Sequence, residues 1–484
     1  MAVATSRRHA VTNPSTLEHV GEVEFSSIED VQREIQHAHE AFAKWSKTPF
    51  AERAEILRKT AELLRKFSDE IAATLTREQG KPLKEAKIEV ERTADTFDLY
   101  AADDIAELVD SQLSSRAKPV LCADKVSRDS DYVPGKTARV MRRPLGACAA
   151  IVPWNFPLTL MANKLVPALA TGNTVVVKPA PSTPLAAARC IELLYEAGLP
   201  KGVVGIVVGG ADVGAALIEH PHIRKVSFTG STTTGKAIMA LAAKGLKRLT
   251  LELGGNDAMI VCEDADVVSA ARAAAVGRFF NAGQACIATK RIYVHRSKYA
   301  EFVERVTERA AKLPIGDGFD PNVRMGPLHS QPQRESVEGF VRDAVAHGAK
   351  AAAGGKRPDA GKGYFFEPTV LVDVPDNSRV IREECFGPVL PVMPFDSMDE
   401  AIARANSTVF GLGSSIWTND TALQERAVRE LDAGYTWIND IATDYDRLPF
   451  GGVKESGFGK ERGTEVLGEY LELKSVVAGA AGHG

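Results

Sequence analysis

The sequence lacks the patterns that mark several classes of protein. Its six cysteines form no C-x-x-C pair and its ten histidines no H-x-x-x-H pair, so no metal site is predicted. The cysteines are scattered and mostly lie in apolar surroundings, which favours a reducing compartment over a disulfide framework. The first residues contain no apolar core of a secretory signal. We therefore expect a cytoplasmic protein without a metal centre.

An excess of positive charge and a plausible membrane span are also missing. The formal net charge is -4 and the pI about 6.3, which argues against a nucleic-acid surface. One uncharged stretch, residues 145–163, is long enough to span a bilayer. It contains Pro153, Asn155 and Pro157, which would leave backbone groups unpaired in lipid. We expect a buried strand and a loop there, and no membrane association.

The sequence does contain the alternating helix and strand patterns of an α/β protein. Predicted helices at 28–46, 51–79 and 83–113 form a first layer, and we expect Glu89, Glu91 and Arg92 on a solvated face. Apolar strands then alternate with helices, at 147–152, 174–178, 202–208, 225–229 and 248–253. This order predicts a mostly parallel, doubly wound sheet, whose ligands bind outside the carboxyl ends of its strands. A second α/β unit follows from about residue 256 to about 447.

Cys286 follows a glycine-containing turn and precedes a predicted strand at 290–295. A thiol on a tight turn between a helix and a strand can face a cleft. The alternative is a small core hydrophobe, since free cysteine is among the most buried residue types. The local sequence leaves both interpretations open.

Three further polar side chains stand at positions suited to chemistry. Glu252 ends an apolar strand before two glycines, where partial burial would raise its pKa towards that of a useful base. Asn155, between two prolines, could donate to an oxyanion, or it could simply form a turn. Lys178 ends a strand where a cofactor's ribose is expected, although a solvated lysine is the more common case.

A glycine-rich turn at 228–237 joins a strand to a helix, a geometry that offers N–H groups to a phosphate. It nearly matches a nucleoside-triphosphate loop, but Ala237 replaces the hydroxyl that would hold magnesium. A dinucleotide pyrophosphate needs no such hydroxyl. A nucleotide hydrolase is therefore disfavoured but stays an alternative.

Seven short motifs, taken together and in order, resemble those of the aldehyde dehydrogenase superfamily, and the resemblance extends from about Asn13 to Val477. They are Pro-Trp-Asn-Phe-Pro at 153–157, Lys-Pro at 178–179, Phe-Thr-Gly-Ser at 228–231, Glu-Leu-Gly-Gly at 252–255, Asn-Ala-Gly-Gln-Ala-Cys at 281–286, Glu-Cys-Phe-Gly-Pro at 384–388 and Pro-Phe-Gly-Gly at 449–452.

The resemblance implies a role for each site residue. Cys286 would be the nucleophile, Glu252 the general base and Asn155 the oxyanion donor. The cofactor would be NAD or NADP, with NAD slightly favoured. It would be bound by a set of six residues: Trp154, Lys178 at the adenosine ribose, Gly230 and Ser231 at the pyrophosphate, Glu384 at the nicotinamide ribose and Phe386 against the nicotinamide.

It also implies three parts and an assembly. Residues 1–125 and 146–255 would form a Rossmann-like cofactor domain, and residues 256–447 a second α/β catalytic domain. Residues 126–145 and 448–484 would form a small β element that bridges subunits in a homodimer or homotetramer. The strands at 132–143 and 469–477 belong to this element. The N-terminus lacks the opening hairpin of the family, by this interpretation.

Departures from the family pattern bear on specificity. Pro181 stands where many NAD-preferring relatives have a glutamate, so NADP is not repelled. Asn163 and Ala288 replace an arginine and a cysteine that succinate-semialdehyde relatives often show, which disfavours a dicarboxylic semialdehyde. The loop at 441–447 is expected to line the substrate mouth.

The expected reaction is oxidation of an aldehyde to a carboxylic acid through a Cys286 thioester that Glu252 helps to hydrolyse. A coenzyme-A-acylating variant is disfavoured because Glu252 supplies a hydrolytic base. A folded, non-catalytic relative is the second alternative. The sequence does not indicate which aldehyde is used.

Overall fold

The structure, a computed structural model, describes residues 8–109, 137–359, 361–441 and 446–478. An antiparallel hairpin opens it, with strands β1 (Arg8–Thr12) and β2 (His19–Glu24). The expectation that this hairpin is missing was wrong. Its turn is closed by local bonds, from the Leu17 N–H to the Asn13 carbonyl and from the Ser15 N–H to the Asn13 side chain, which the turn-rich sequence alone did not reveal.

Helices follow the hairpin along the chain. Ser27 and Asp30 form a capping box at the start of α1. The expected helix at 51–79 is divided at Phe67, whose backbone leaves the helical region, and the helix expected at 83–113 ends at Tyr100. Residues beyond 109 lie outside the described ranges. The helices are α1 (Ile28–Trp45), α2 (Phe50–Lys66), α3 (Ser68–Gln79), α4 (Leu83–Tyr100) and α5 (Asp103–Val109).

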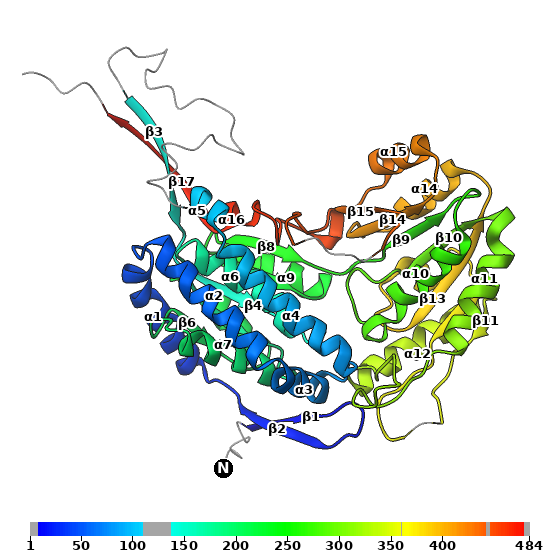
Figure 1. Cartoon of the computed structure of the whole chain (residues 1–484), viewed down its shortest axis with the longest axis horizontal. Coiled ribbons are helices and arrows are strands. Elements are labelled where there is room, and N and C mark those ends of the chain that lie inside the picture. The colour runs from blue at the N-terminus through cyan, green and yellow to red at the C-terminus, as the bar shows by residue number, and fades with distance from the viewer. Residues whose placement is uncertain (1–7, 110–136, 360, 442–445, 479–484) are drawn as a thin grey trace, which may run out of the picture.

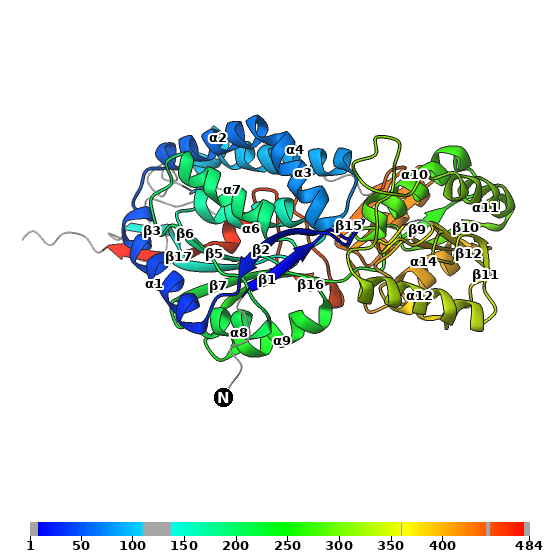
Figure 2. The same ribbon diagram turned by 90° about the horizontal axis from the view of Figure 1, so that it is seen from below.

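The first large sheet has the order β16-β8-β7-β4-β5-β6, in which the first pair is antiparallel and the rest parallel. Helices cover both faces (Figures 1 and 2), which confirms the doubly wound prediction. Its strands are β4 (Ala147–Ile151), β5 (Thr174–Lys178), β6 (Val204–Ile206), β7 (Ile223–Thr229), β8 (Arg248–Glu252) and β16 (Gly457–Phe458). The helices between them are α6 (Pro157–Ala170), α7 (Leu185–Glu196), α8 (Ala211–Glu219) and α9 (Thr232–Ala243).

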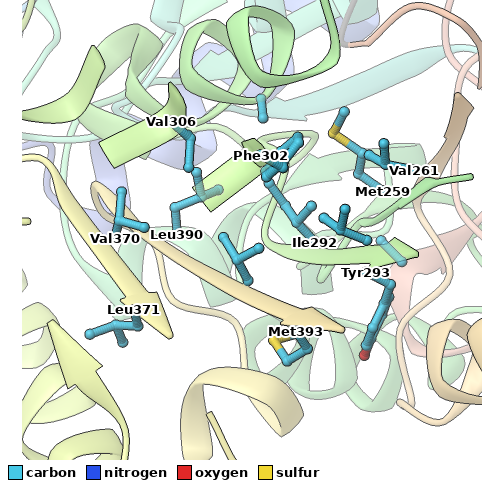
Figure 3. Packing of buried hydrophobic residues seen from close by; sticks show 14 of the residues in the cluster. Met259, Val261, Ile292, Tyr293, Phe302, Val306, Val370, Leu371, Leu390 and Met393 are labelled. Carbon is cyan, nitrogen blue, oxygen red and sulfur yellow. The ribbon is translucent and has the colours of Figure 1, made fainter. Parts of the chain in front are cut away.

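The second large sheet has the order β11-β12-β13-β10-β9-β14-β15 and is parallel except at β11. Its buried side chains, among them Met259, Ile292 and Phe302, form one continuous core (Figure 3). The strands are β9 (Ala258–Val261), β10 (Arg291–His295), β11 (Lys350–Ala353), β12 (Thr369–Val372), β13 (Val389–Phe395), β14 (Gly413–Trp417) and β15 (Tyr435–Ile438). The helices are α10 (Val267–Phe279), α11 (Arg296–Ala311), α12 (Gln331–Ala346), α13 (Arg379–Arg382), α14 (Met398–Asn406) and α15 (Thr421–Glu430).

A two-stranded ribbon projects from the first sheet (Figure 1). It pairs β3 (Thr137–Pro144) with β17 (Leu471–Ala478) in antiparallel register, after the short helix α16 (Val466–Glu469). Of the strand expected at 132–143, residues 132–136 lie outside the described residues. The other half pairs within its own chain, so its contact with a second subunit stays a prediction.

Candidate active site

The candidate nucleophile follows a strained turn. The 3-10 segment η2 (Phe280–Gly283) connects α10 to Cys286, and Asn281, Ala282 and Gly283 have φ values of 48°, 54° and 73°. Two of these are not glycine, and such a backbone persists only where its surroundings hold it. The Asn281 N–H donates to Glu85 Oε2 at 2.9 Å. At Gly283 a Cβ would lie 2.3 Å from the Gly387 carbonyl oxygen, so only glycine fits.

Cys286 differs from the other cysteines that the structure describes. Four of them are buried, whereas Cys286 keeps part of its surface exposed, as expected of a thiol that faces a cleft. Its carbonyl oxygen accepts a hydrogen bond from Lys290 Nζ, which also donates to the Ala285 carbonyl at 3.0 Å. Lys290 thereby fixes the backbone on which the thiol stands.

Glu252 ends β8 next to this thiol. Its side chain is 1% exposed and, apart from the Cys286 thiol, neither carboxylate oxygen has a hydrogen-bond partner within the described ranges. Burial raises the pKa of Glu252 to about 8 and the negative Glu461 adds to the rise, while Lys164 and the Cys286 thiol oppose it. An unpaired buried carboxyl with such a pKa is a candidate acid–base group.

The thiol responds to the same surroundings. Burial raises the pKa of Cys286 well above its ordinary value, and the Glu252 charge raises it further, whereas Lys290 lowers it. Near neutral pH the thiol therefore keeps its proton, and most Glu252 carboxyls are protonated as well. In the fraction of molecules whose Glu252 is ionised, the thiol proton can move to that carboxylate rather than to bulk water.

Asn155 lies on the other side of the nucleophile turn. It is 4% exposed, and its Nδ2 donates to the Gln284 carbonyl at 3.0 Å. The backbone carbonyl of Asn155 accepts hydrogen bonds from Lys81 Nζ at 2.7 Å and from Asn281 Nδ2 at 3.0 Å. The three predicted catalytic side chains thus belong to one cluster, assembled from the β4–α6 loop, the end of β8 and the η2 turn.

A buried ion pair supports this cluster, and it corrects one expectation. Glu89 is 3% exposed rather than solvated, and it pairs with Lys81 at 2.5 Å. It also accepts from the Leu158 N–H at 3.0 Å, at the positive end of α6. Glu91, by contrast, is exposed and pairs with Arg65 at 2.8 Å.

The predicted cofactor residues fall into two groups. Lys178, Gly230 and Ser231 stand at the carboxyl ends of β5 and β7, and Ser231 caps α9. Burial lowers the pKa of Lys178, which is 8% exposed, while Asp212 opposes the shift; its ammonium has no hydrogen-bond or ion-pair partner in the described part of the chain. A buried ammonium without a partner, beside a helix start, fits the ribose and phosphates of a dinucleotide.

The second group adjoins Cys286. Glu384 accepts from the Gly255 N–H at 3.0 Å and pairs with Lys290 at 3.2 Å. The ring of Trp154 meets that of Phe386 edge-on, 5.6 Å between centroids, and stacks on His329 at 4.5 Å. Among the residues that the structure describes, no cluster of three or more His, Cys, Asp or Glu is placed to hold a metal ion, and no helix is long and apolar enough to cross a membrane.

Sequence reasoning missed the ion pair behind Glu252. Lys164 Nζ donates to Glu461 Oε1 and to Thr229 Oγ1, both at 2.6 Å, with both charged side chains almost fully buried. A signal existed, because Lys164 is the single charged residue of α6. Glu461 gave no such signal.

Comparison with known proteins finds one family. A family model described as "Aldehyde dehydrogenase family" matches residues 2–476. A probable succinate-semialdehyde dehydrogenase [NADP(+)] of Sinorhizobium fredii (strain NBRC 101917 / NGR234) is 39% identical over 477 residues, covering 98% of this chain and 93% of the relative. The mitochondrial succinate-semialdehyde dehydrogenase of Arabidopsis thaliana is 40% identical over 473 residues, covering 97% and 86%.

Solved structures are similarly close. An NADP-dependent enzyme of E. coli superposes with a TM-score of 0.91 at 38% identity, covering 98% of this chain and 95% of the other. Betaine aldehyde dehydrogenase from Staphylococcus aureus in complex with NAD+ superposes with a TM-score of 0.91 at 33% identity, covering 100% and 94%.

Proposed function

Because the chain belongs to the aldehyde dehydrogenase family, and is therefore an NAD(P)-dependent enzyme that oxidises aldehydes, we propose that Cys286 is its nucleophile. The observation that carries this proposal is the partly exposed Cys286 beside the buried carboxyl of Glu252, whose one hydrogen-bond partner within the described residues is the Cys286 thiol. When Glu252 is ionised, the thiol transfers its proton to that carboxylate, and the thiolate sulfur bonds to the aldehyde carbon. The amide of Asn155 uses one N–H for Gln284 and has a second for the oxyanion.

NAD(P), when bound, supplies the hydride acceptor, and the carbonyl carbon is left as a thioester on Cys286. Lys178, Gly230 and Ser231 would hold the adenosine half of the cofactor, and Trp154, Glu384 and Phe386 the nicotinamide half. Glu252 must first release the thiol's proton to solvent; as a carboxylate it then takes a proton from water, and the resulting hydroxide displaces the sulfur. A carboxylic acid leaves and the thiol is restored.

The parts of the molecule are expected to have different roles in this chemistry. We propose that the first large sheet and its helices bind the cofactor, that the second carries the nucleophile, and that the β3–β17 ribbon bridges subunits of a homo-oligomer. The cytoplasmic location stays a prediction. For the cofactor, Pro181 adds no negative charge that would repel a 2′-phosphate, so we propose that NADP is accepted as well as NAD.

The names of the relatives suggest a first candidate for the substrate. Succinate semialdehyde heads the candidates on that ground, although Asn163 and Ala288 speak against a dicarboxylic semialdehyde. With the Asn163 amide oxygen oriented towards Arg462, that oxygen accepts a hydrogen bond from Arg462 Nε at 3.2 Å. A buried guanidinium from the C-terminal segment therefore lies beside Asn163. Residues 442–445 of the loop expected at the substrate mouth lie outside the described ranges.

The test is reduction of NAD and NADP, followed by absorbance, over an aldehyde panel that includes succinate semialdehyde, betaine aldehyde and uncharged aldehydes. Cys286→Ala should abolish turnover while the protein still folds and binds the cofactor. The matched control, Cys190→Ala, removes a thiol on the buried face of α7 and should retain turnover. Undiminished turnover in Cys286→Ala would refute the assignment. Magnesium-dependent ATP hydrolysis would instead support the nucleotide-hydrolase alternative.

A further inference from the structure

A cleft with a cationic lining lies outside the candidate active site. The start of α4, α10 and the second half of α11 line this cleft, and its volume is about 680 Å³. These helices lie where the two large parts of the molecule meet (Figure 2). Cys286, Glu252 and Asn155 are not among its lining residues. Clefts of this size commonly hold small organic molecules.

The charges that line this cleft are mostly positive. Only two carboxyls, Glu85 and Glu308, line it against six cations: Lys84, Arg272, Arg305, Arg309, Lys312 and Arg324. In the whole chain acidic residues outnumber basic ones, 63 to 59, so the local excess opposes the overall charge. A cleft lined by one sign of charge concentrates ligands of the opposite sign.

Four of these six cations have no carboxylate partner within the part of the chain that is described. Lys312 pairs with Glu308 at 2.5 Å, and Arg305 with Glu301 at 2.8 Å. No such pair is formed by the other four, which are exposed: Lys84, Arg272, Arg309 and Arg324, of which Arg324 donates to backbone carbonyls. Their mutual repulsion would be relieved by an anion placed among them.

Apolar side chains lie beside the cations. Val276 is 58% and Ile88 40% exposed, and Phe279 and Phe280 complete this surface. Phe280 is half-buried and stacks on Phe156, with 6.1 Å between the ring centroids. The cleft therefore offers contact to an apolar body as well as to a negative charge.

The floor of the cleft adjoins the nucleophile turn from outside. Glu85, one of the two lining carboxyls, accepts the Asn281 N–H. Burial raises the pKa of Glu85 to about 8, so this carboxyl is largely protonated near neutral pH and does not repel an anion.

We propose that this cleft is a binding site for an organic anion with an apolar body, of the class of medium-chain carboxylates, and that it is separate from the aldehyde site. The cations lining the cleft hold the carboxylate, and the alkyl chain lies against Val276 and Phe280. The cleft is open to solvent as the chain is folded, so the proposal requires no movement of the chain.

The experiment is calorimetric titration of the full chain with octanoate. Octanamide, which has the same body without the charge, and acetate, which has the charge without the body, serve as control probes. Octanoate should bind at a saturable site, and each control probe should bind at least roughly tenfold more weakly. Arg272→Glu and Arg309→Glu should each weaken octanoate binding by roughly tenfold or more.

The matched control is Arg342→Glu, which reverses an exposed arginine on α12, outside the cleft. It should leave octanoate binding unchanged, and thermal melts of all variants show whether they remain folded. Unchanged octanoate affinity in both cleft variants would overturn the proposal, and so would octanamide binding as tightly as octanoate. A third contrary result would be octanoate inhibition that is competitive with aldehyde and is not changed by Arg309→Glu. Because binding is measured without turnover, the result does not depend on the proposed reaction.

Discussion

Replacing Glu252 by glutamine should stabilise the protein at alkaline pH while it removes the proposed base. Glu252 is 1% exposed, and its pKa is raised from 4.5 to about 8, first by burial and then by the charge of Glu461. The carboxyl thus weakens the fold whenever it must ionise. Glutamine keeps the size of the side chain and has no charge to bury.

The magnitude follows from the two pKa values. Between pH 4.5 and about 8 the folded chain keeps a proton that the unfolded chain has released, so stability falls as the pH rises. The contribution of this group is fully present below pH 4.5 and is lost by the time the pH passes its folded pKa. The difference of about 3.5 pKa units, at about 1.36 kcal/mol each, amounts to about 5 kcal/mol.

Urea unfolding of the wild type and of Glu252→Gln, each at about pH 5 and about pH 9, measures this difference. Glu78 and Glu85 also have raised pKa values, but they are common to both proteins and cancel in the comparison. From the lower to the higher pH the variant should gain roughly 4 kcal/mol in free energy of unfolding relative to the wild type. Aldehyde oxidation should fall roughly 10²–10⁴-fold.

Two results would contradict this reasoning. Equal pH dependence of stability in the two proteins would mean that Glu252 ionises as easily in the folded chain as in water. Full turnover in the variant would mean that another group removes the proton from water. Glu461, whose charge acts on Glu252, would then be the first residue to examine.

The α/β architecture was predictable because its signals are local. The run Thr174–Val177 is apolar and bounded by turn residues, and it forms β5 with Lys178 at its carboxyl end, as expected. The same reasoning placed Glu252 at the end of β8. The break between α2 and α3 at Phe67 was missed, because no glycine or proline marks it and apolar spacing continues across it.

The support of the site was not predictable, because it comes from contacts between distant segments. Glu89 stands in a helix among charged neighbours, a pattern that predicts a solvated side chain. In the structure Lys81 and the start of α6 bury it. The glycine before Cys286 indicated a turn. Asn281 and Ala282 share the left-handed backbone of this glycine, and the Asn281 N–H is held there by donating to the carboxyl of Glu85, 196 residues away in the chain.

Three further changes probe these contacts. Lys81→Met leaves the Glu89 carboxylate buried without its partner and should cost roughly 3–5 kcal/mol in urea unfolding, part of which Glu89→Leu restores in the double variant. Pro181→Glu places a carboxylate after β5 and should lower kcat/KM for NADP roughly tenfold relative to NAD, as measured with both cofactors. Gly283→Ala puts a Cβ 2.3 Å from the Gly387 carbonyl oxygen at a residue whose φ is 73°, so the turn must move and carry the thiol with it. The rate of Cys286 alkylation by iodoacetamide and kcat should then both change; if both match the wild type, the thiol does not depend on this turn for its position.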